Sequence, residues 1–547
     1  MTDTTPPRVF LLDAHCDMGL SHTVVGSKAA NLARLTALGL RIPPAIAIST
    51  SIGQTGLTEA GLRPDVRSEI EAAIRLLEAA TGLTMGQRDP LLVSVRSSPP
   101  VSMPGMLETL LNVGLTPGGV PGLTRRTGNP WLAWDALRRL TRSFAETVYG
   151  LDAGPLDQLA VERLTAAGAR TLQELDPLAL RDLARDSASL GQTIGVRVPA
   201  DPVEQVIVSV EAVLRSWNSP RAREYRRMNG IDERTGTGVL VQAMVFGNAG
   251  GRSGSGVGFT RNPASGEDQL YVDFLFNAQG EDVVSGRQPI FEGALLPDVL
   301  PAVWTELLEA KSALEREFGD MQDFEFTVSD GRLFFLQTRA GKRSPLAALR
   351  IATDLVGAEI IDSDTAVDRL KAYDLDRIEH VTVEGAGPDS LIARATPAGV
   401  GVATGRLAFD SQRALRLAAH DAVILARREI TTDDISGLAA TVGIVTTLGG
   451  RTSHAAVVAR QMEKVCLVGC ADLSVDERAR RCSFGDRIFR EGEVISLDGE
   501  TGAVYAGEVA VVRQRPLEAL AKVESWRRAA HPDGELRPAP STLSDFT

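Results

Sequence analysis

The sequence predicts a multidomain protein of mixed α/β and α+β class, and three observations support this prediction. The chain has 547 residues, which is too long for one hydrophobic core and suits roughly two to four domains. It contains 44% hydrophobic and 23% charged residues, values close to the average for globular proteins. Strand-like apolar runs alternate with helical patterns over most of the chain, as expected for mixed folds.

The pattern divides the chain into consecutive segments. Residues 1–344 mix helical patterns with strand-like runs and predict an α/β or α+β domain, in which residues about 114–202 form a helical subdomain. Residues 345–390 predict a helical connector. In residues 391–510, short apolar strands alternate with helical or turn segments, which indicates a compact α/β domain with βαβ packing. Residues 511–547 predict a short helix followed by a disordered polar tail.

Charge and cysteine content exclude several classes of function. The formal net charge is -12, which argues against a general nucleic-acid or anionic-membrane surface. We find no basic leader and no apolar run near the ~18 residues of a spanning helix, so we expect a cytoplasmic protein. The 4 cysteines form neither a disulfide framework nor paired zinc knuckles. Cys466 and Cys470 lie in an apolar stretch, and we expect them to be buried thiols.

The segment from Thr446 to Cys470 carries the most information about chemistry. Two consecutive glycines allow close approach of the backbone, and Thr452 or Ser453 can cap a helix whose first turn contains His454. Free N–H groups and the helix dipole favour an anion there, and imidazole is a nucleophile near neutral pH. A lone histidine is more often structural, so the role of His454 has to be inferred from the residues around it.

Two cations in the first hundred residues suit a phosphate ligand. Lys28 falls in the first turn of a predicted helix, pointing away from its apolar stripe. Arg96 ends the apolar strand LLVSV, where a guanidinium can form two parallel hydrogen bonds to phosphate oxygens from a rigid base. By itself, a first-turn lysine is more often a solvated surface residue.

Residues 322–339 alternate between polar and apolar side chains and predict a β-hairpin. If residues 329–331 form a three-residue loop with the glycine in the left-handed position, Asp323, Glu325 and Gln337 share one face. Their carboxylate and amide oxygens are the ligands that Mg²⁺ prefers. A two-residue loop would instead split this set. The alternative is an amphipathic edge hairpin with solvated charges.

The run GGRTSHAAVVAR closely resembles the phosphohistidine signature of the pyruvate phosphate dikinase family. The resemblance extends to about residue 510 through LLVSVRSS, SMPGM, RSWNSPRAREYRRMN, QAMVFGN, GVGFTRNPASGE, NAQGEDVVSG, MQDFEFT and FFLQTRAGKR. It implies an ATP-grasp-like nucleotide-binding domain, followed by a swivelling phosphohistidine domain whose hinge is the connector. The site residues that it implies are His454 as the phosphorylated residue, Lys28 and Arg96 as ATP contacts, Asp323, Glu325 and Gln337 as magnesium ligands, and Arg339 as a phosphate contact.

The resemblance also implies a reaction. His454 would attack the β-phosphorus of ATP, displace AMP and pass the terminal phosphoryl group to orthophosphate or water. The run SSPPVSMPGM departs from the glycine and arginine expected after Arg-Ser, so the second acceptor stays open between orthophosphate, as in pyruvate phosphate dikinase, and water, as in phosphoenolpyruvate synthases. Leu448 and Arg451 change the charge beside His454, and Thr452 matches a threonine that is regulated in some dikinases.

Full-length dikinases carry a pyruvate-binding (β/α)₈ barrel of about 250 residues after the histidine domain. The residues after 510 cannot form such a barrel. We therefore expect a separate acceptor subunit that carries the barrel, or another acceptor supplied in trans. The alternatives are a water-type dikinase and a non-catalytic phosphocarrier or regulatory module.

Overall fold

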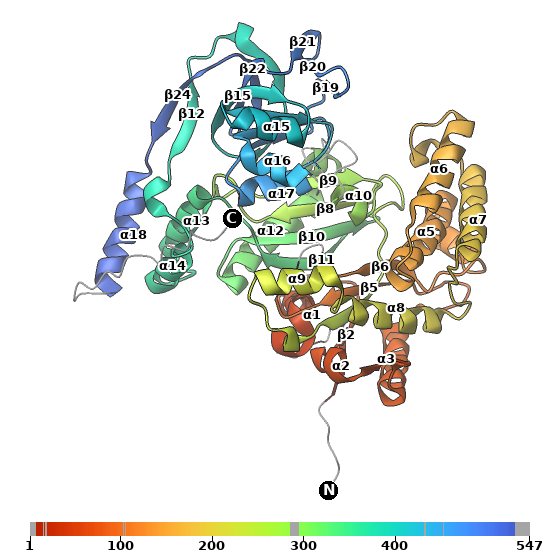
Figure 1. Cartoon of the computed structure of the whole chain (residues 1–547). Coiled ribbons are helices and arrows are strands. Elements are labelled where there is room, and N and C mark those ends of the chain that lie inside the picture. Colours follow the sequence, from red (N-terminus) through yellow and green to blue (C-terminus); the bar gives the residue numbers. More distant parts are fainter. Residues whose placement is uncertain are drawn as a thin grey trace. The chain divides into compact units, whose positions relative to one another are not determined.

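The computed structural model describes residues 7–530 except 15, 17–18, 102, 104–105, 285–294, 431–433 and 452. It shows a multidomain protein in which helices accompany several sheets (Figure 1). The chain forms two compact units, each made of two stretches of sequence. Unit 1 comprises Met1–Gly254 and Phe326–Thr338, and unit 2 comprises Ser255–Glu325 and Arg339–Thr547.

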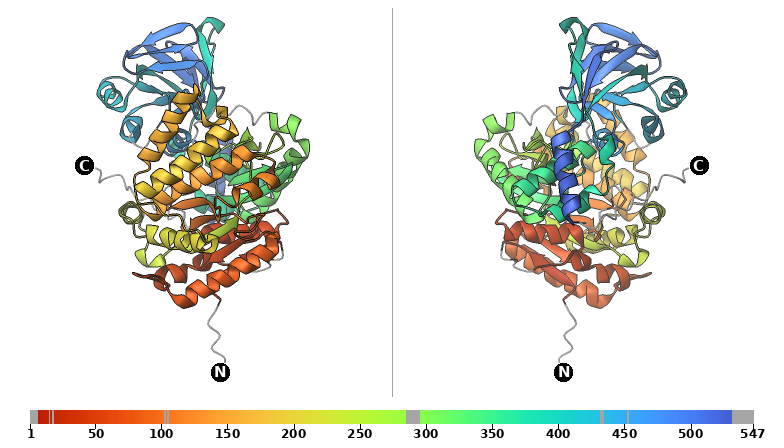
Figure 2. Two further views of the ribbon diagram at one scale, coloured as in Figure 1. Left: turned by 90° about the vertical axis from the view of Figure 1, so that its right-hand side faces the viewer. Right: turned by 90° about the vertical axis from the view of Figure 1, so that its left-hand side faces the viewer.

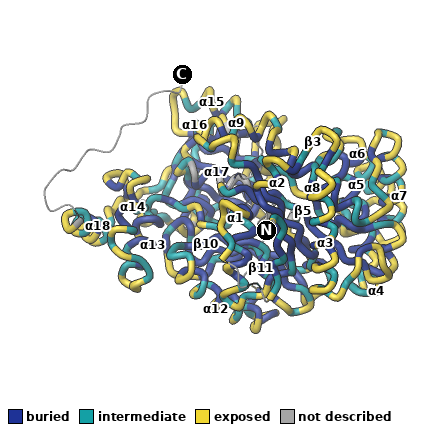
Figure 3. The backbone as a smooth tube through the Cα atoms, turned by 90° about the horizontal axis from the view of Figure 1, so that it is seen from below, coloured by how far each residue is buried: buried dark blue, intermediate teal, exposed yellow. Residues whose placement is uncertain are grey.

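Unit 1 is built on an antiparallel five-stranded sheet of order β1-β2-β7-β5-β6. Apolar residues of these strands are buried in one cluster with apolar residues of neighbouring helices, and Figure 3 colours such buried positions dark blue. The strands are β1 (Val9–Leu12), β2 (Ala45–Ile48), β5 (Val93–Ser98), β6 (Thr109–Val113) and β7 (Gly238–Ala243), and the helices that pack on them include α1 (His22–Ala37), α3 (Pro64–Thr81) and α8 (Pro202–Ser216).

The range 114–202, for which the sequence predicts helices, contains a helical layer in which α5 packs on α4 and α7, and α6 also packs on α7 (Figure 2, orange and yellow). Side-chain caps fix the starts of two of these helices: Asn129 accepts from the Leu132 N–H, and Asp176 accepts from the Leu178 N–H. The helices are α4 (Val120–Thr127), α5 (Pro130–Ser143), α6 (Gly154–Ala167) and α7 (Pro177–Thr193).

A four-stranded sheet of order β11-β10-β8-β9 includes the predicted hairpin. Its strands are β8 (Gly254–Phe259), β9 (Tyr271–Phe276), β10 (Gln322–Ser329) and β11 (Arg332–Ala340). The hairpin is present, but its loop differs from the prediction. Strand pairing resumes at Arg332, and both Asp330 and Gly331 have positive φ, 48° and 75°, so they form a two-residue turn of type I′ geometry.

The three-residue loop was therefore wrong. Farther from the turn, the Gly341 N–H donates to the Met321 carbonyl at 3.0 Å and the Arg339 side chain contacts Asp323 at 2.8 Å. That Asp323, Glu325 and Gln337 share one face stays a prediction.

The connector begins with two helices, α13 (Pro345–Gly357) and α14 (Ser363–Leu370), but it is not helical throughout. Strand β12 (His380–Glu384) pairs antiparallel with β24 (Ala510–Gln514). The predicted C-terminal helix is present as α18 (Leu517–Ala530), and its buried Val523 packs in a cluster with Leu349 of α13. The predicted polar tail from residue 531 lies outside the described residues.

Residues 391–506 form an α/β layer around an eight-stranded sheet of order β13-β23-β22-β15-β16-β17-β18-β14. Four adjacent strands of this sheet run parallel, as the βαβ pattern predicts. They are β15 (Val402–Ala408), β16 (Val423–Arg427), β17 (Gly443–Thr446) and β18 (Val465–Val468), flanked by β13 (Leu391–Arg394), β14 (Thr396–Gly399), β22 (Val494–Asp498) and β23 (Ala503–Ala506), with helices α15 (Ser411–Ala418), α16 (Ile435–Ala440) and α17 (His454–Gln461).

Across the part of the chain that the structure describes, every helix is too short or too polar to span a lipid bilayer.

Candidate functional site

Lys28 lies just after a kink in α1. Gly26 has φ 78° and ψ 166°, which interrupt the helix, and a Cβ there would lie 1.6 Å from the Ser98 carbonyl oxygen. The Ser98 hydroxyl donates to the Val25 carbonyl at 3.0 Å and accepts from the Ala29 N–H at 3.2 Å. The helix segment that carries Lys28 is therefore tied directly to the end of β5.

Arg96 lies on β5, two residues before that anchor. Its backbone pairs with Leu240 of β7 on one side and Thr109 of β6 on the other, so the strand provides a rigid base. Its Nη2 donates to the Gln337 side-chain oxygen at 3.3 Å. The structure thus brings two predicted site residues of unit 1 into contact, and it ties Lys28 to the same strand.

Asp323 and Arg339 form a pair within unit 2. The Arg339 Nε and Nη2 both contact Asp323 Oδ2 at 2.8 Å, and Asp323 is only 7% exposed. Burial raises the pKa of Asp323, and the Arg339 charge opposes that rise. The negative charge of Asp323 in turn raises the pKa of Arg339. Glu325 adds negative charge close enough to raise both pKa values.

These residues fit a divalent cation in chemistry. A carboxylate whose pKa is raised by burial gains most when a cation stabilises its ionised form, and Glu325 and the Gln337 amide supply further oxygens. Over the described ranges, no group of three or more His, Cys, Asp or Glu side chains is placed to hold a metal ion. The predicted set contains only two carboxylates, so the metal assignment stays a prediction.

His454 is the first residue of α17, as predicted. Ser453 caps the helix, and its hydroxyl accepts from the Ala456 N–H at 3.4 Å. The segment before it leaves the carboxyl end of the parallel strand β17, the edge at which α/β sheets place ligand sites. Thr452 lies outside the described residues.

Sequence reasoning missed Arg427, at the end of β16. Its Nη1 donates to the Phe409 carbonyl at 3.0 Å and contacts Glu477 at 2.8 Å, and Nη2 lies 3.5 Å from Asp434. The Arg427 carbonyl accepts from the Thr447 N–H, so this residue fixes the start of the loop that leads to the histidine. An arginine that ends an apolar strand, as Arg96 does, is the signal that could have found it.

Arg451 stacks on an aromatic ring rather than pointing freely into solvent. Its guanidinium carbon lies 3.9 Å from the centre of the Tyr271 ring, and the Tyr271 hydroxyl donates to the Pro397 carbonyl at 2.8 Å. Burial raises the pKa of Tyr271 to about 12, so the ring stays neutral at physiological pH.

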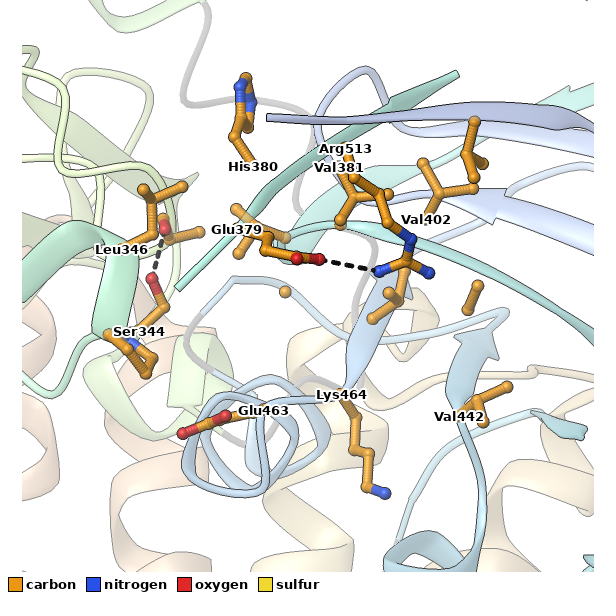
Figure 4. Close-up of a pocket in the computed structure, with 18 of the residues that line it drawn as sticks. Ser344, Leu346, Glu379, His380, Val381, Val402, Val442, Glu463, Lys464 and Arg513 are labelled. Atoms are coloured by element: carbon orange, nitrogen blue, oxygen red, sulfur yellow. Dashed lines mark hydrogen bonds and ion pairs between the residues drawn. The ribbon is translucent and has the colours of Figure 1, made fainter. Parts of the chain in front are cut away.

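Unit 2 also contains a cavity of about 620 Å³ (Figure 4). It is lined by residues of the connector, β24 and the α/β layer, among them Ser344, Glu379, Lys464 and Arg513. Glu379 and Arg513 form an ion pair at 3.2 Å beside it. Among the side chains that the structure describes, none of the predicted ATP and magnesium contacts lines this cavity; these are Lys28, Arg96, Asp323, Glu325, Gln337 and Arg339.

Comparison with known proteins gives two family matches. Residues 57–290 match the pyruvate phosphate dikinase AMP/ATP-binding domain, and residues 419–502 match the mobile domain of PEP-utilising enzymes. The first range includes Arg96 and the second includes His454. Lys28 and the hairpin residues Asp323 to Arg339 lie outside both ranges.

Full-length relatives match over most of the chain. A pyruvate, phosphate dikinase of Clostridium symbiosum is 41% identical over 499 residues, 89% of this chain and 56% of the relative. A chloroplastic pyruvate, phosphate dikinase of Flaveria pringlei is 38% identical over 96% of this chain and 55% of its own. A pyruvate, phosphate dikinase of Rhizobium meliloti is 38% identical over 92% of this chain and 58% of the relative. The chain spans about half the length of the curated relatives it matches.

Proposed function

This chain belongs to the pyruvate phosphate dikinase family, and on that premise we propose that it is an ATP-dependent phosphotransferase that loads a phosphoryl group onto His454. The observation that carries the proposal is the position of His454 at the capped start of α17. The imidazole can act as a nucleophile there, and the helix N-terminus favours the phosphoryl group that it acquires.

The nucleotide half is proposed to be an ATP-grasp-like domain over residues 1–344. Lys28 and Arg96 would meet the phosphates of ATP, and the tie between α1 and β5 supports this role because it fixes both cations relative to one another. The contact of Arg96 with Gln337 connects the same cation to the hairpin. Preorganised cations are the main requirement for phosphoryl transfer.

We propose that Asp323, Glu325 and Gln337 hold Mg²⁺ and that Arg339 contacts phosphate. When bound, Mg²⁺ neutralises negative charge on the phosphate oxygens of ATP. The raised pKa of Asp323 supports its place in this set, because a cation at this position would relieve the cost of burying the carboxylate.

The proposed transfer forms a bond between a ring nitrogen of His454 and the β-phosphorus of ATP. The bond from that phosphorus to the bridging oxygen of AMP breaks, and AMP leaves with the electron pair. The terminal phosphoryl group then passes to orthophosphate or to water, and a phosphohistidine remains. The connector at 345–390 would let the domain of residues 391–510 swing to a distant acceptor site.

Pyruvate, which the names of the relatives contain, is the proposed final acceptor. It would be bound by a barrel on a separate subunit, and the alternative is another acceptor supplied in trans. Orthophosphate is the proposed second acceptor and water is the alternative, because SMPGM is kept while the residues before it differ from the family pattern.

An isotope experiment tests this function. The full chain is incubated with Mg²⁺ and ATP labelled at the β-phosphorus, with and without orthophosphate. We expect acid-labile label on the protein, and we expect the terminal phosphoryl group of ATP to be recovered as pyrophosphate when orthophosphate is present. Recovery of that terminal group as orthophosphate when none has been added would establish the water-type reaction instead. A protein that binds ATP but acquires no label under either condition would contradict the proposed transfer and favour a non-catalytic phosphocarrier.

A further inference from the structure

The loop before His454 contacts the sheet that carries the predicted hairpin. Tyr271 begins β9 of that sheet, and the Arg451 guanidinium carbon lies 3.9 Å from the centre of its ring. The Tyr271 hydroxyl donates to the Pro397 carbonyl on β14 at 2.8 Å. One side chain of β9 therefore contacts the α/β layer of residues 391–506 at two points, and one of these points is three residues from His454.

Arg460, the last residue of the run GGRTSHAAVVAR, supports this contact from within the layer. Its Nη1 donates to the Arg451 carbonyl at 2.8 Å and to the Ala398 carbonyl at 3.2 Å. Its guanidinium carbon lies 5.6 Å from the centre of the Phe259 ring, which packs edge-on against Tyr271 with 6.4 Å between the ring centres. One connected set of contacts thus fixes both the backbone of Arg451 and the ring that its side chain faces.

The guanidinium groups of Arg451 and Arg460 rest on aromatic rings and backbone carbonyls. The Nε of each is buried without a hydrogen-bond partner among the described residues. A ring face attracts a guanidinium group without directed hydrogen bonds. Separating a cation from a ring leaves no unpaired carboxylate behind, whereas separating a buried ion pair does. The contact therefore suits two surfaces that have to part and meet again.

The same contact lies close to the predicted magnesium ligands. Tyr271 is on β9 of the sheet of order β11-β10-β8-β9, and Asp323 is on β10. Burial raises the pKa of Asp323, and the Arg460 charge is one of those that oppose this rise. Arg460 therefore lies near enough to Asp323 for the two charges to interact. The segment that leads to His454 is held beside the sheet that carries these ligands.

We propose that Arg451 and Tyr271 form a docking contact that positions the loop before His454 for phosphoryl transfer. This inference rests on the proposed function, to which it adds two positioning residues that the sequence motifs do not assign. Arg451 is one of the residues beside His454 that depart from the family pattern, and the docking contact gives this departure a role. When the layer swings away, the Tyr271 ring releases Arg451 and the Pro397 carbonyl together.

Single-turnover labelling of the full chain, with Mg²⁺, orthophosphate and ATP labelled at the β-phosphorus, measures the rate of transfer to His454. Loss of a cation–π contact shielded from water predicts that Arg451→Met slows this transfer about tenfold. Tyr271→Leu slows it equally, and Tyr271→Phe keeps the ring and most of the rate. The variant that combines Arg451→Met with Tyr271→Leu is no slower than either change alone, because both remove the same contact.

Two controls separate positioning from other effects. Arg487→Met removes another guanidinium group of the α/β layer, 5.8 Å from the centre of the Phe489 ring, and transfers at the parent rate. Calorimetric titration with ATP and Mg²⁺ gives the parent affinity for Arg451→Met and Tyr271→Leu, because the docking contact acts on the loop and not on the nucleotide.

Nitration by tetranitromethane reports the contact independently of the reaction. In the parent protein, Arg451 covers the Tyr271 ring, so Tyr271 reacts more slowly than Tyr149, which is 40% exposed. Arg451→Met raises nitration of Tyr271 about tenfold, by the same loss of the cation–π contact, and leaves Tyr149 unchanged. Peptide mass mapping measures both sites.

Equal nitration rates of Tyr271 and Tyr149 in the parent protein would overturn the inference whatever the reaction shows. Transfer by Arg451→Met at the parent rate would also overturn it, while the proposed function would stand. A loss of ATP affinity as large as the loss of rate would do the same, because the residues would then act on nucleotide binding. A parent protein in which Tyr271 is protected but His454 takes up no label would overturn the proposed function, and with it the role of the contact in transfer.

Discussion

Arginines that end buried strands recur at the two places where this molecule is expected to handle phosphate. Arg96 ends the apolar part of β5 and contacts Gln337, and Arg427 ends β16 and fixes the loop before His454. A strand gives the long side chain a rigid base, so less side-chain entropy is lost on binding. The sequence motif pointed to Arg96. It did not point to Arg427, although Arg427 likewise ends an apolar strand.

The buried thiols give a prediction at the same scale. Cys466, Cys470 and Cys482 are buried, and burial raises their pKa values to about 12, about 11 and about 12. The half-buried Cys16 is outside this group. We expect iodoacetamide to modify Cys16 alone in the folded protein, from neutral pH up to about pH 9, because the other three thiols stay protonated and inaccessible. Peptide mass mapping measures the sites.

The pH dependence has a definite sign. Since the folded pKa of each buried thiol lies above the ordinary value of 9.0, these groups support folding fully below pH 9.0, and that support is lost as the pH rises toward their folded values. Denaturant should expose every cysteine to the reagent, which is the control. Modification of Cys466 as fast as Cys16 in the folded protein would show that the core is not packed as described.

Some secondary-structure elements can be predicted from local sequence patterns alone, and others cannot. The cap at Ser453 marks a helix start that the sequence predicts, because capping is a local interaction. The hairpin has a two-residue turn instead of the predicted three-residue loop, although Asp330-Gly331 is a favoured pair for a two-residue turn. Strand β12 was missed because its partner β24 lies more than a hundred residues away and no local pattern announces it.

The kink in α1 allows a test with a matched control. Gly26 and Gly39 have similar φ values, 78° and 76°, but a Cβ at Gly26 would strike the Ser98 carbonyl, whereas nothing lies within 4 Å of one at Gly39. Gly39→Ala should therefore cost only the left-handed strain of about 1 kcal/mol. Gly26→Ala should cost at least about 2 kcal/mol more, because α1 and β5 must separate.

Urea unfolding of the two variants, followed by circular dichroism, measures this difference. We also expect Gly26→Ala to bind ATP more weakly than Gly39→Ala, because the tie between the Lys28 segment and β5 is lost. Equal unfolding midpoints for the two variants would show that the close approach of Gly26 and Ser98 does not exist in solution.

The whole molecule contains relations that a sequence pattern could not supply. The boundaries between the two compact units follow residues 254, 325 and 338. All three lie inside the span that the sequence predicts as one nucleotide-binding domain. A local pattern does not show them, because strands far apart in sequence pair with one another. The predicted functional boundaries remain predictions, since spatial compactness does not identify where nucleotide binds. The predicted α/β character of residues 391–510 could be read from sequence because its parallel strands are short, apolar and closely spaced.

Two strands, β12 and β24, connect the α/β layer of residues 391–506 to the helices α13, α14 and α18. The chain enters it through β12 and leaves through β24, and these strands pair along five residues each before α18 packs against α13 and α14. A hinge in the connector would therefore have to bend a two-stranded ribbon. Such a ribbon restrains the path of a domain more than one flexible strand does, which suits repeated movement between two fixed sites.

The central claim is that His454 takes a phosphoryl group from ATP. Its most direct test is to incubate the full chain with ATP, Mg²⁺ and orthophosphate, quench at alkaline pH, and locate acid-labile phosphate by peptide mass spectrometry. We predict phosphate on His454 of the parent and none on a His454→Asn variant that still binds AMP as tightly as the parent does. A His454→Asn variant that takes up as much acid-labile phosphate as the parent would contradict the account.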